Sequence, residues 1–392
     1  MRRFIRYLVI VALWTSVLIL ATFGSMMVIL ASSFLPNQII VLISAGVFFV
    51  AYTWFCYNFT MRISFKKQLQ VMILSVTVWA SYVGYIEYHR SIPQMKGEVD
   101  LYYYRPFEEA AYENRLATLD EPSKFKVSGI IPRIDGATGL YPLYAAIAQA
   151  TYPKMDYYPY YEPDNEKSLV RCSKTPKAYE NLISGKVDVI FVAGPSNKQL
   201  AMAKKEGVEL KLTPIGKEAF VFFVNSKNKV NNLSVEQMKK IYSGKITNWS
   251  DVGGGNDSIR AFQRPENSGS QTALQRIMGD TPLMKALRED VPASMGGIIN
   301  QVADYRNYSN SLGYSFLFFA TKMVNNKEIK LLSIDGIEAN HDNIRSGKYP
   351  FAKEFYAVTR NNETRETREL IEWIRSEQGK ELIRKSGFVP VE

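Results

Sequence analysis

The stretch IRAFQRPENSGSQTALQRIM, residues 259–278, contains in order the parts of a strand–loop–helix unit. Its first residues are mostly apolar and predict a strand, Ile259–Gln263. A loop of small polar residues follows, and the spacing of the apolar residues after it predicts a helix at Gln271–Met278. A strand that leads into a helix through a short loop is the repeating unit of an α/β fold.

The same alternation continues on both sides of this unit. Further strands are predicted at Val187–Ala193, Ala219–Asn225, Gly313–Phe319 and Phe355–Thr359, and further helices at Leu143–Ala150, Ala178–Ile183, Val235–Tyr242 and Glu366–Lys385. Strands that alternate with helices are typical of a sheet whose strands run mostly parallel. The sequence therefore predicts an α/β domain with a largely parallel sheet from residue 127 onward.

Three predicted helices begin at segments rich in hydroxyl groups and glycine. These are Asp135-Gly136-Ala137-Thr138-Gly139-Leu140-Tyr141-Pro142, Thr175-Pro176 and Arg264-Pro265-Glu266-Asn267-Ser268-Gly269-Ser270. Helix N-termini attract anions, and a guanidinium grips a tetrahedral oxyanion through two N–H groups. Each segment also has an ordinary interpretation: Thr175 as a helix cap, Thr138 as part of a turn, and Arg264 as a surface residue. Together they favour a site for a phosphate-like anion.

The basic residues are unevenly distributed along the 392 residues. The chain has 48 Lys and Arg against 38 Asp and Glu, a net charge of +10. Residues 1–86 contain six of the basic residues and none of the acidic ones, so the remainder carries a net charge of only +4. That balance is ordinary for a protein surface in water and argues against nucleic acid as a partner.

Cysteine and histidine are scarce. The chain has Cys56 and Cys172, and His89 and His341. A zinc site needs about four such ligands at close spacing, and two isolated cysteines do not make a disulfide framework. Neither histidine lies in a recognisable catalytic motif. No metal and no cofactor is therefore predicted, and most classes of enzyme are excluded.

Three apolar segments lie within the first 86 residues. Residues 7–30, 39–57 and 69–86 carry no charge and are long enough to cross the ~30 Å hydrocarbon core of a bilayer. A cleaved signal peptide is the alternative for the first segment, but two more segments follow it directly. Basic residues precede the first segment and separate the second from the third, which places both stretches on the cytoplasmic side. We expect a three-span anchor (1–86) in the cell membrane with a cytoplasmic N-terminus.

The remainder of the chain is then extracytoplasmic. Residues 87–126 are rich in Tyr, Glu and Pro, and we expect a stalk with one short helix near Phe107–Leu119. The α/β domain follows at 127–392.

Several motifs in this domain resemble the phosphate-binding proteins of bacterial phosphate ABC importers. The resemblance covers about residues 127–391 in order, but not the three apolar segments. The motifs are Gly136–Leu143, Leu233–Gln237, Gly244–Ser250, Val252–Gly254, the R-x-x-x-S-G-S stretch from Arg264, Gly313-Tyr314, Gly347–Pro350 and the ending Gly379 to Pro390.

The resemblance implies a two-lobed, periplasmic-binding-protein-like clamshell of type II, preceded here by three transmembrane α-helices. The lobes would be about 127–216 plus 321–392, and 217–320. Phosphate would bind between them and pass to the membrane subunits of an ABC importer, with no catalysis. The implied phosphate ligands are Thr138, Gly139, Leu140, Thr175, Arg264, Ser268, Gly269 and Ser270, and Glu266 would orient the arginine.

One position departs from the family pattern. Some relatives have an aspartate after the strand that begins near Asp188, where it accepts the proton of hydrogen phosphate. By spacing, this chain has Ala193 there, and Ser196 is a substitute candidate. Asp188 itself is interpreted as a structural residue. The preference for phosphate over a fully ionised oxyanion is therefore open.

Three other interpretations remain. In the first, the ligand is sulfate or a phosphonate. In the second, the chain is a phosphate-sensing membrane receptor. In the third, Ser268 is the nucleophile of a hydrolase. The last lacks a G-x-S-x-G motif and a histidine in a matching motif. The receptor has no cytoplasmic domain to carry a signal and would need other membrane subunits.

Overall fold

The structure, a computed structural model, describes residues 70, 77, 81, 94–95, 99–107, 113–160, 169–285, 305–306, 309–324 and 328–392. The chain divides into two compact units, Met1–Ser91 and Ile92–Glu392. In the first unit only Gln70, Thr77 and Ser81 are described, each helical, so the three predicted spans otherwise lie outside the described residues. Among the described residues, no helix combines the length and the hydropathy needed to cross a bilayer.

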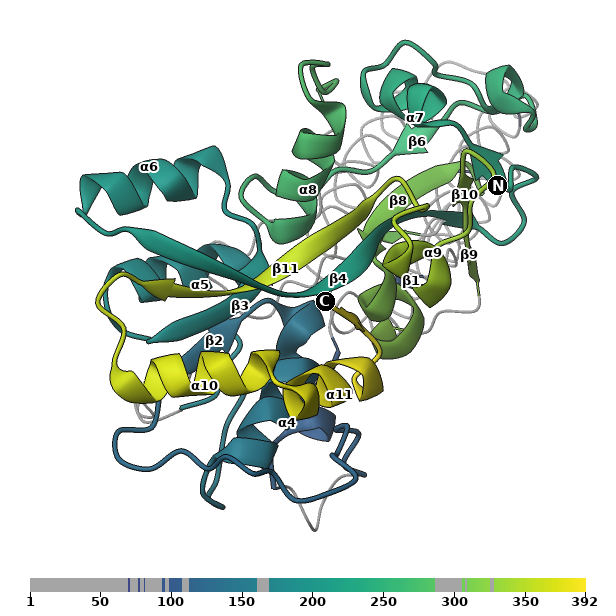
Figure 1. Ribbon diagram of the computed structural model, residues 1–392. Helices are drawn as coiled ribbons and strands as arrows, with labels where there is room; N and C mark the ends of the chain where they lie inside the picture. The colour runs from purple at the N-terminus through teal and green to yellow at the C-terminus, as the bar shows by residue number, and fades with distance from the viewer. Residues whose placement is uncertain are drawn as a thin grey trace, which may run out of the picture. The chain divides into compact units, whose positions relative to one another are not determined.

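The second unit alternates strands and helices (Figure 1). The strands are β1 (Gln94–Met95), β2 (Ile134–Gly136), β3 (Val189–Ala193), β4 (Leu210–Asn225), β5 (Asn232–Leu233), β6 (Arg260–Ala261), β7 (Tyr305–Arg306), β8 (Ser311–Phe316), β9 (Ile329–Leu331), β10 (Ser333–Ile334), β11 (Ala352–Arg360) and β12 (Val389–Pro390). The α-helices are α4 (Tyr141–Thr151), α5 (Lys174–Ile183), α6 (Asn197–Lys205), α7 (Val235–Tyr242), α8 (Gly269–Met278), α9 (His341–Arg345), α10 (Arg365–Arg375) and α11 (Glu377–Lys385). Short turns of other helix types are η1 (Leu101–Tyr104), η2 (Thr138–Leu140), η3 (Trp249–Val252) and η5 (Phe319–Val324).

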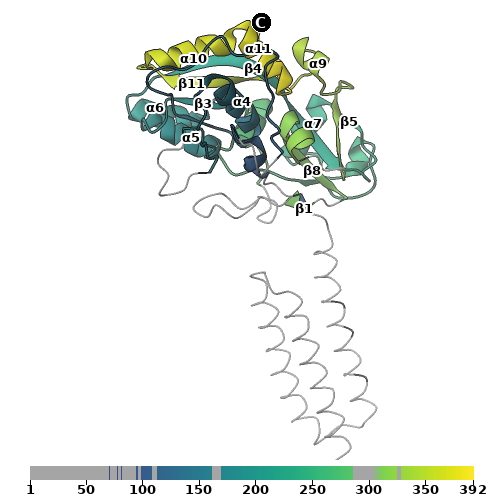
Figure 2. The same cartoon turned by 90° about the horizontal axis from the view of Figure 1, so that it is seen from below.

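The first lobe is a three-layer sandwich around the strands β2-β3-β11-β4. Successive residues of β3 point to opposite faces, as in any strand. Val189 and Phe191 pack with α4, α10 and α11, whereas Ile190 and Val192 pack with α5. In Figure 2, α10 and α11 lie above the strands and α5 lies below them. This double coverage explains why β3 reads as a continuous apolar run.

The second lobe is built on the far half of β4. That half pairs with β8, and β8 pairs with β6. A second apolar cluster surrounds these strands and contains Phe220 and Phe222 of β4, Met238 of α7 and Leu274 of α8. Two strands therefore connect the lobes: β4 runs from the first to the second, and β11 runs back.

The expected parallel sheet is wrong in this central region. β2 with β3 and β6 with β8 are parallel pairs, but β11 is antiparallel to both β3 and β4, and β4 is antiparallel to β8. The physical reason is the crossing itself. A chain that leaves one lobe along one strand and returns along its neighbour must pair those strands antiparallel.

The expected lobe boundary at residue 320 is also wrong. β9 pairs with the second-lobe half of β4, and β10 pairs with β5. Ile334, Ile344, Tyr349 and Phe351 are buried in the second-lobe cluster. The chain therefore touches the first lobe at Met323 but belongs to the second lobe from β9 until β11 begins at Ala352.

The predicted helix Glu366–Lys385 is two helices that meet at Ser376. This residue is extended (φ −69°, ψ 171°), and its hydroxyl accepts a hydrogen bond from Gly379 N at 3.4 Å, which caps α11. Gly379 approaches the end of α10 so closely that an added Cβ would lie 2.1 Å from the Ile374 carbonyl oxygen. A serine cap followed three residues later by glycine is therefore the local cause of the break.

The segment expected to be a stalk packs onto the first lobe. Leu101 and Tyr104 are buried in its core, and Phe125 stacks on Trp373 of α10 with ring centroids 6.4 Å apart. Residues 113–119 are not helical, and the rest of the helix expected near 107–119 lies partly outside the described residues. Apolar side chains spaced through a polar segment can still bury themselves against a neighbouring core.

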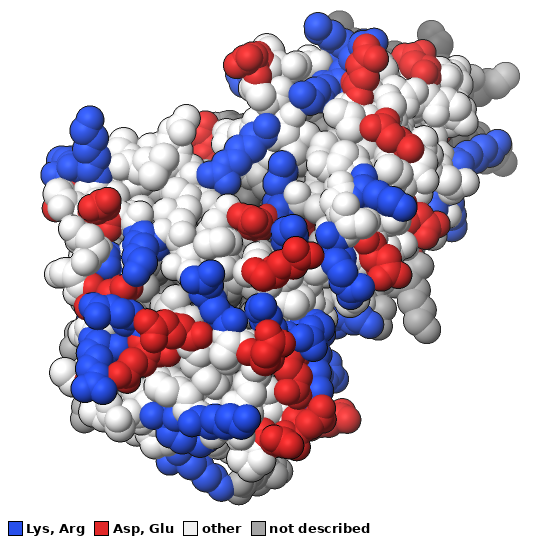
Figure 3. Space-filling model, in the orientation of Figure 1, with Lys and Arg blue, Asp and Glu red and all other residues white. Residues whose placement is uncertain are grey.

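Charged side chains are interspersed on the surface. Figure 3 shows Lys and Arg alternating with Asp and Glu over the face drawn. Attraction of an anion is therefore expected from local groups rather than from a broad field on this face.

We predict that Gly379→Ala destabilises the protein by at least about 1–3 kcal/mol, because the new methyl group forces α10 and α11 apart. Gly255→Ala is the matched control, since a Cβ there meets only an Asp257 carboxyl oxygen at 3.7 Å, and it should change stability by less than about 0.5 kcal/mol. Urea unfolding of both variants checks this. Equal midpoints for the two variants would show that the helix junction tolerates a side chain.

Candidate anion-binding site

The loop that carries Thr138 is held from below by a buried carboxylate. Asp135 is the middle residue of β2 and has no exposed surface. It accepts hydrogen bonds from Gly136 N at 2.7 Å, Ser173 N at 2.8 Å, Asn181 Nδ2 at 2.8 Å and the Ser173 hydroxyl. Burial raises the pKa of Asp135, and these bonds oppose the rise. One side chain thus joins the 136–140 loop to the start of α5.

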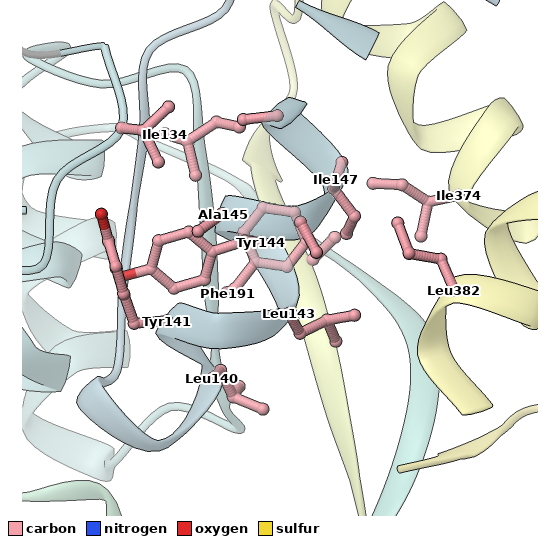
Figure 4. Packing of buried hydrophobic residues seen from close by; sticks show 14 of the residues in the cluster. Ile134, Leu140, Tyr141, Leu143, Tyr144, Ala145, Ile147, Phe191, Ile374 and Leu382 are labelled. Atoms are coloured by element: carbon pink, nitrogen blue, oxygen red, sulfur yellow. The ribbon is translucent and has the colours of Figure 1, made fainter. Parts of the chain in front are cut away.

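Glycine is required where this loop leaves the sheet. A Cβ at Gly136 would lie 2.5 Å from the Phe191 carbonyl oxygen and 2.8 Å from the Tyr144 ring. Tyr144 itself stacks on Phe191 with centroids 5.3 Å apart. Figure 4 shows α4 packed between these rings and the side chains of Ile374 and Leu382. The first turn of α4 is therefore anchored by the core, and η2 places Thr138 and Gly139 ahead of it, partly exposed.

Thr175 lies within the first turn of α5 rather than at its cap. The residue before the helix is Ser173, whose side chain makes no capping bond because it is turned to Asp135. The expected N-cap role of Thr175 is therefore wrong. Thr175 is buried, and the neighbouring Cys172 sulfur lies 3.6 Å from the Thr138 hydroxyl oxygen. The Thr138 loop and the start of α5 are thus adjacent.

The segment with Arg264 follows β6 in the second lobe. The backbone N–H of Arg264 donates to Gln271 Oε1 at 2.9 Å and to the Tyr314 hydroxyl at 2.8 Å. Ser268 caps α8 by accepting from Gln271 N at 3.3 Å. Asn267 before it has a left-handed backbone (φ 65°), a conformation that asparagine adopts more readily than most residues. This turn directs the N-terminus of α8.

The structure brings the starts of α5 and α8 together across the two lobes. A Cβ added to Gly269 would lie 3.1 Å from the Thr175 hydroxyl oxygen. Two further contacts hold the lobes at this edge. The Ser196 hydroxyl donates to Asn267 Oδ1 at 3.1 Å, and the Arg276 guanidinium donates to the Pro195 carbonyl. Two helix N-termini from different lobes therefore face a shared position.

Four further residues near the proposed site have defined places in the structure. Asp188 is structural as expected: it accepts from Arg133 N and forms an ion pair with the Arg133 guanidinium at 2.8 Å. The Ala193 carbonyl is occupied by the Tyr179 hydroxyl at 3.0 Å. Ser196 serves as the cap of α6 with Gln199. Glu266 is exposed to solvent.

Three supporting residues of the site were not predicted from the sequence. Asp135, Asn267 and Arg276 form the contacts that join the loops and the lobes. Asp135 had a detectable signal, because an acid between Ile134 and the glycine-rich loop is unusual inside a core. Arg276 had none, since its partner Pro195 is distant in sequence.

We predict that Asp135→Ala lowers stability by about 3 kcal/mol or more, because it leaves the buried donors of Gly136, Ser173 and Asn181 unpaired. Asp257→Ala removes an exposed carboxylate of the same kind and should cost less than about 0.5 kcal/mol. Thermal and urea unfolding compare them. A loss no larger than in the control would mean that the carboxylate does not hold the loops.

The chain is similar to several proteins that are known by name. The phosphate-binding protein PstS of Bacillus subtilis is 27% identical over 200 residues, which span 50% of this chain and 63% of that protein, less than two thirds of its length. PstS of Borreliella burgdorferi is 26% identical over 218 residues, 53% of this chain and 76% of that protein. A solved ABC-type phosphate transport receptor from Vibrio cholerae is 21% identical and superposes with a TM-score of 0.46, covering 65% of this chain and 98% of that one.

The match to a family as a whole covers more of the chain. The PBP superfamily domain matches residues 133–378, from the strand before the Thr138 loop to the start of α11. That range includes both lobes and both crossing strands. The chain therefore belongs to the PBP superfamily domain family.

Proposed function

We propose that this protein is an extracytoplasmic solute-binding protein that captures inorganic phosphate between its two lobes for ABC-type import. The observation that carries the proposal is the close approach of Gly269 to Thr175, where an added Cβ would lie 3.1 Å from the Thr175 hydroxyl oxygen, because it brings together helix N-termini from different lobes beside Thr138. Relatives that bear the name phosphate-binding protein support it.

Each proposed ligand has a chemical role. The hydroxyls of Thr138 and Thr175 and the N–H groups of Gly139 and Leu140 donate from the first lobe. Ser268, Gly269 and Ser270 donate from the start of α8, whose N-terminus carries about half a positive charge. Arg264 supplies the full charge and two parallel N–H donors. Glu266 supports the arginine from the solvent side.

Closure of the lobes is the step that completes the site. Donors from one lobe alone leave part of the anion in water. Contacts between Asn267 and Ser196, and between Arg276 and Pro195, form only when the lobes meet. Phosphate that contacts both lobes binds the closed state better than the open one and shifts the population toward it.

The proposal includes the membrane. Residues 7–30, 39–57 and 69–86 form three spans with the N-terminus in the cytoplasm, and residues after about 87 lie outside. The lipid bilayer then holds the binding domain near the importer, whose membrane subunits are the partners that receive the ligand. The relatives are named as binding proteins, and we propose that this protein likewise binds phosphate and catalyses no reaction. The second candidate is a phosphate-sensing receptor with the same site. Identifying the membrane subunits that co-purify with the full-length protein would distinguish a receptor from a part of an importer.

We predict that Arg264→Ala weakens phosphate binding about a hundredfold or more, because it removes the one full positive charge among the proposed ligands. Arg375→Ala removes an exposed arginine at the end of α10 and should leave the affinity unchanged. Isothermal titration calorimetry of the full-length protein measures both. Normal binding by the Arg264 variant would rule out the proposed site.

We also predict that phosphate binds more tightly than sulfate or methylphosphonate in parallel titrations of the wild-type protein. The two loops offer mainly hydrogen-bond donors. Ala193 stands where some relatives have the acid that accepts the proton of hydrogen phosphate, so the difference in affinity between phosphate and sulfate should be modest. Tight sulfate binding with no response to phosphate would establish the other oxyanion as the ligand.

A further inference from the structure

A pocket of about 230 Å³ lies beside the crossing strand β4. Its walls come from β4, from the helical turn that follows β8, from α9 and from the chain just before β12. In Figure 1 the C-terminus and α9 lie next to β4 at this place. No proposed phosphate ligand is among its lining residues.

The inner wall of the pocket is aromatic and aliphatic. Phe388 packs against Phe318 with centroids 4.7 Å apart and against Phe355 at 5.2 Å. Ile344 of α9 and Val389 are buried beside them. The volume lies below the ~300–1,000 Å³ typical of sites for drug-sized ligands. The space therefore fits an apolar body about the size of a single ring.

One carboxyl group is buried in this wall. Glu218 of β4 is 7% exposed, and Phe318 N donates to its Oε1 at 2.8 Å. Burial raises the pKa of Glu218 to about 8, while the bond from Phe318 N opposes the rise. At neutral pH the group is mostly protonated, so it offers an O–H donor to the pocket.

The outer rim is basic. Lys322 and His341 are exposed, and Lys217 is half-buried next to Glu218. His341 Nε2 lies 3.0 Å from the Gly387 carbonyl oxygen, which orients its ring. A basic rim above an apolar floor complements a molecule with one anionic end and one apolar end.

We propose that this pocket is a second ligand site, which takes a small organic carboxylate. The carboxylate lies beside Lys322 and accepts a hydrogen bond from Glu218, and the apolar body packs on Phe318 and Phe388. Inorganic phosphate has no apolar part and gains nothing from this floor, so the two sites select different ligands.

The full-length protein is titrated with 4-fluorophenylacetate at pH 7, and binding is followed by fluorine NMR. We expect saturable binding that Ile344→Trp weakens at least tenfold, since the indole fills the pocket. Ile130→Trp, at a site that is 68% exposed, is the matched control and should bind as the wild type does. Non-saturable binding, or equal binding by the two variants, would overturn the proposal.

A surface variant guards against loss of folding. The side chain of Lys322 is exposed, so Lys322→Gln should weaken ligand binding several-fold and leave the melting temperature unchanged. Lys245 is exposed elsewhere on the surface, and Lys245→Gln should have no effect on binding. Equal binding by both would show that the basic rim takes no part.

The pH profile tests the position of Glu218. A carboxylate ligand is repelled once Glu218 ionises, so affinity should fall about tenfold between pH 7 and pH 9. Glu218→Gln keeps a neutral donor and should stay within about twofold. The other ionisable lining groups are Lys217, Lys322 and His341, and His341→Gln is the check for the histidine. A fall that persists in Glu218→Gln would contradict the assignment.

Discussion

The antiparallel pairing of β4 with β11 is the constraint on which the architecture depends. The ladder runs from Ala352 opposite Ala219 to Arg360 opposite Leu210, so each strand has one end in each lobe. An irregularity at Phe355 and Tyr356 interrupts it near the crossing. Gly216 makes this possible, because a Cβ there would lie 2.3 Å from the Phe355 ring. The lobes are therefore joined where the backbone has least bulk and the ladder is least regular.

Local signals in the sequence predicted the elements that local chemistry decides. The predicted helix Val235–Tyr242 has the bounds of α7, which begins with a capping box of Ser234 and Gln237, and Ser268 begins α8 close to the predicted start. β4 was predicted only from Ala219 to Asn225, because Lys211, Lys217 and Glu218 interrupt the apolar pattern of its first half. Burial of Glu218 in the crossing region is a tertiary effect that no local pattern encodes.

Strand direction and lobe membership could not be predicted for the same reason. An apolar run indicates burial but not which neighbour the strand pairs with, so the antiparallel crossing was not visible. The short strands β9 and β10 have weak patterns, and their partners on β4 and β5 are about 100 residues away. In the proposed site, Thr138, Thr175 and Ser268 could be put forward as ligands from the sequence because hydroxyls at helix starts are local features. Asn267 and Arg276 were not, because they act only between lobes.

The turn that follows β8 connects the two sites physically. Phe318 lines the pocket beside Glu218, whereas the next residue, Phe319, faces the first lobe, where a Cβ added to Gly139 would lie 3.7 Å from its Cβ. Adjacent residues of one helical turn cannot move independently, because the backbone bonds of the turn tie them together. Packed interiors also transmit small shifts rather than absorb them. A change at either proposed site therefore reaches the other only if it moves the backbone of this turn.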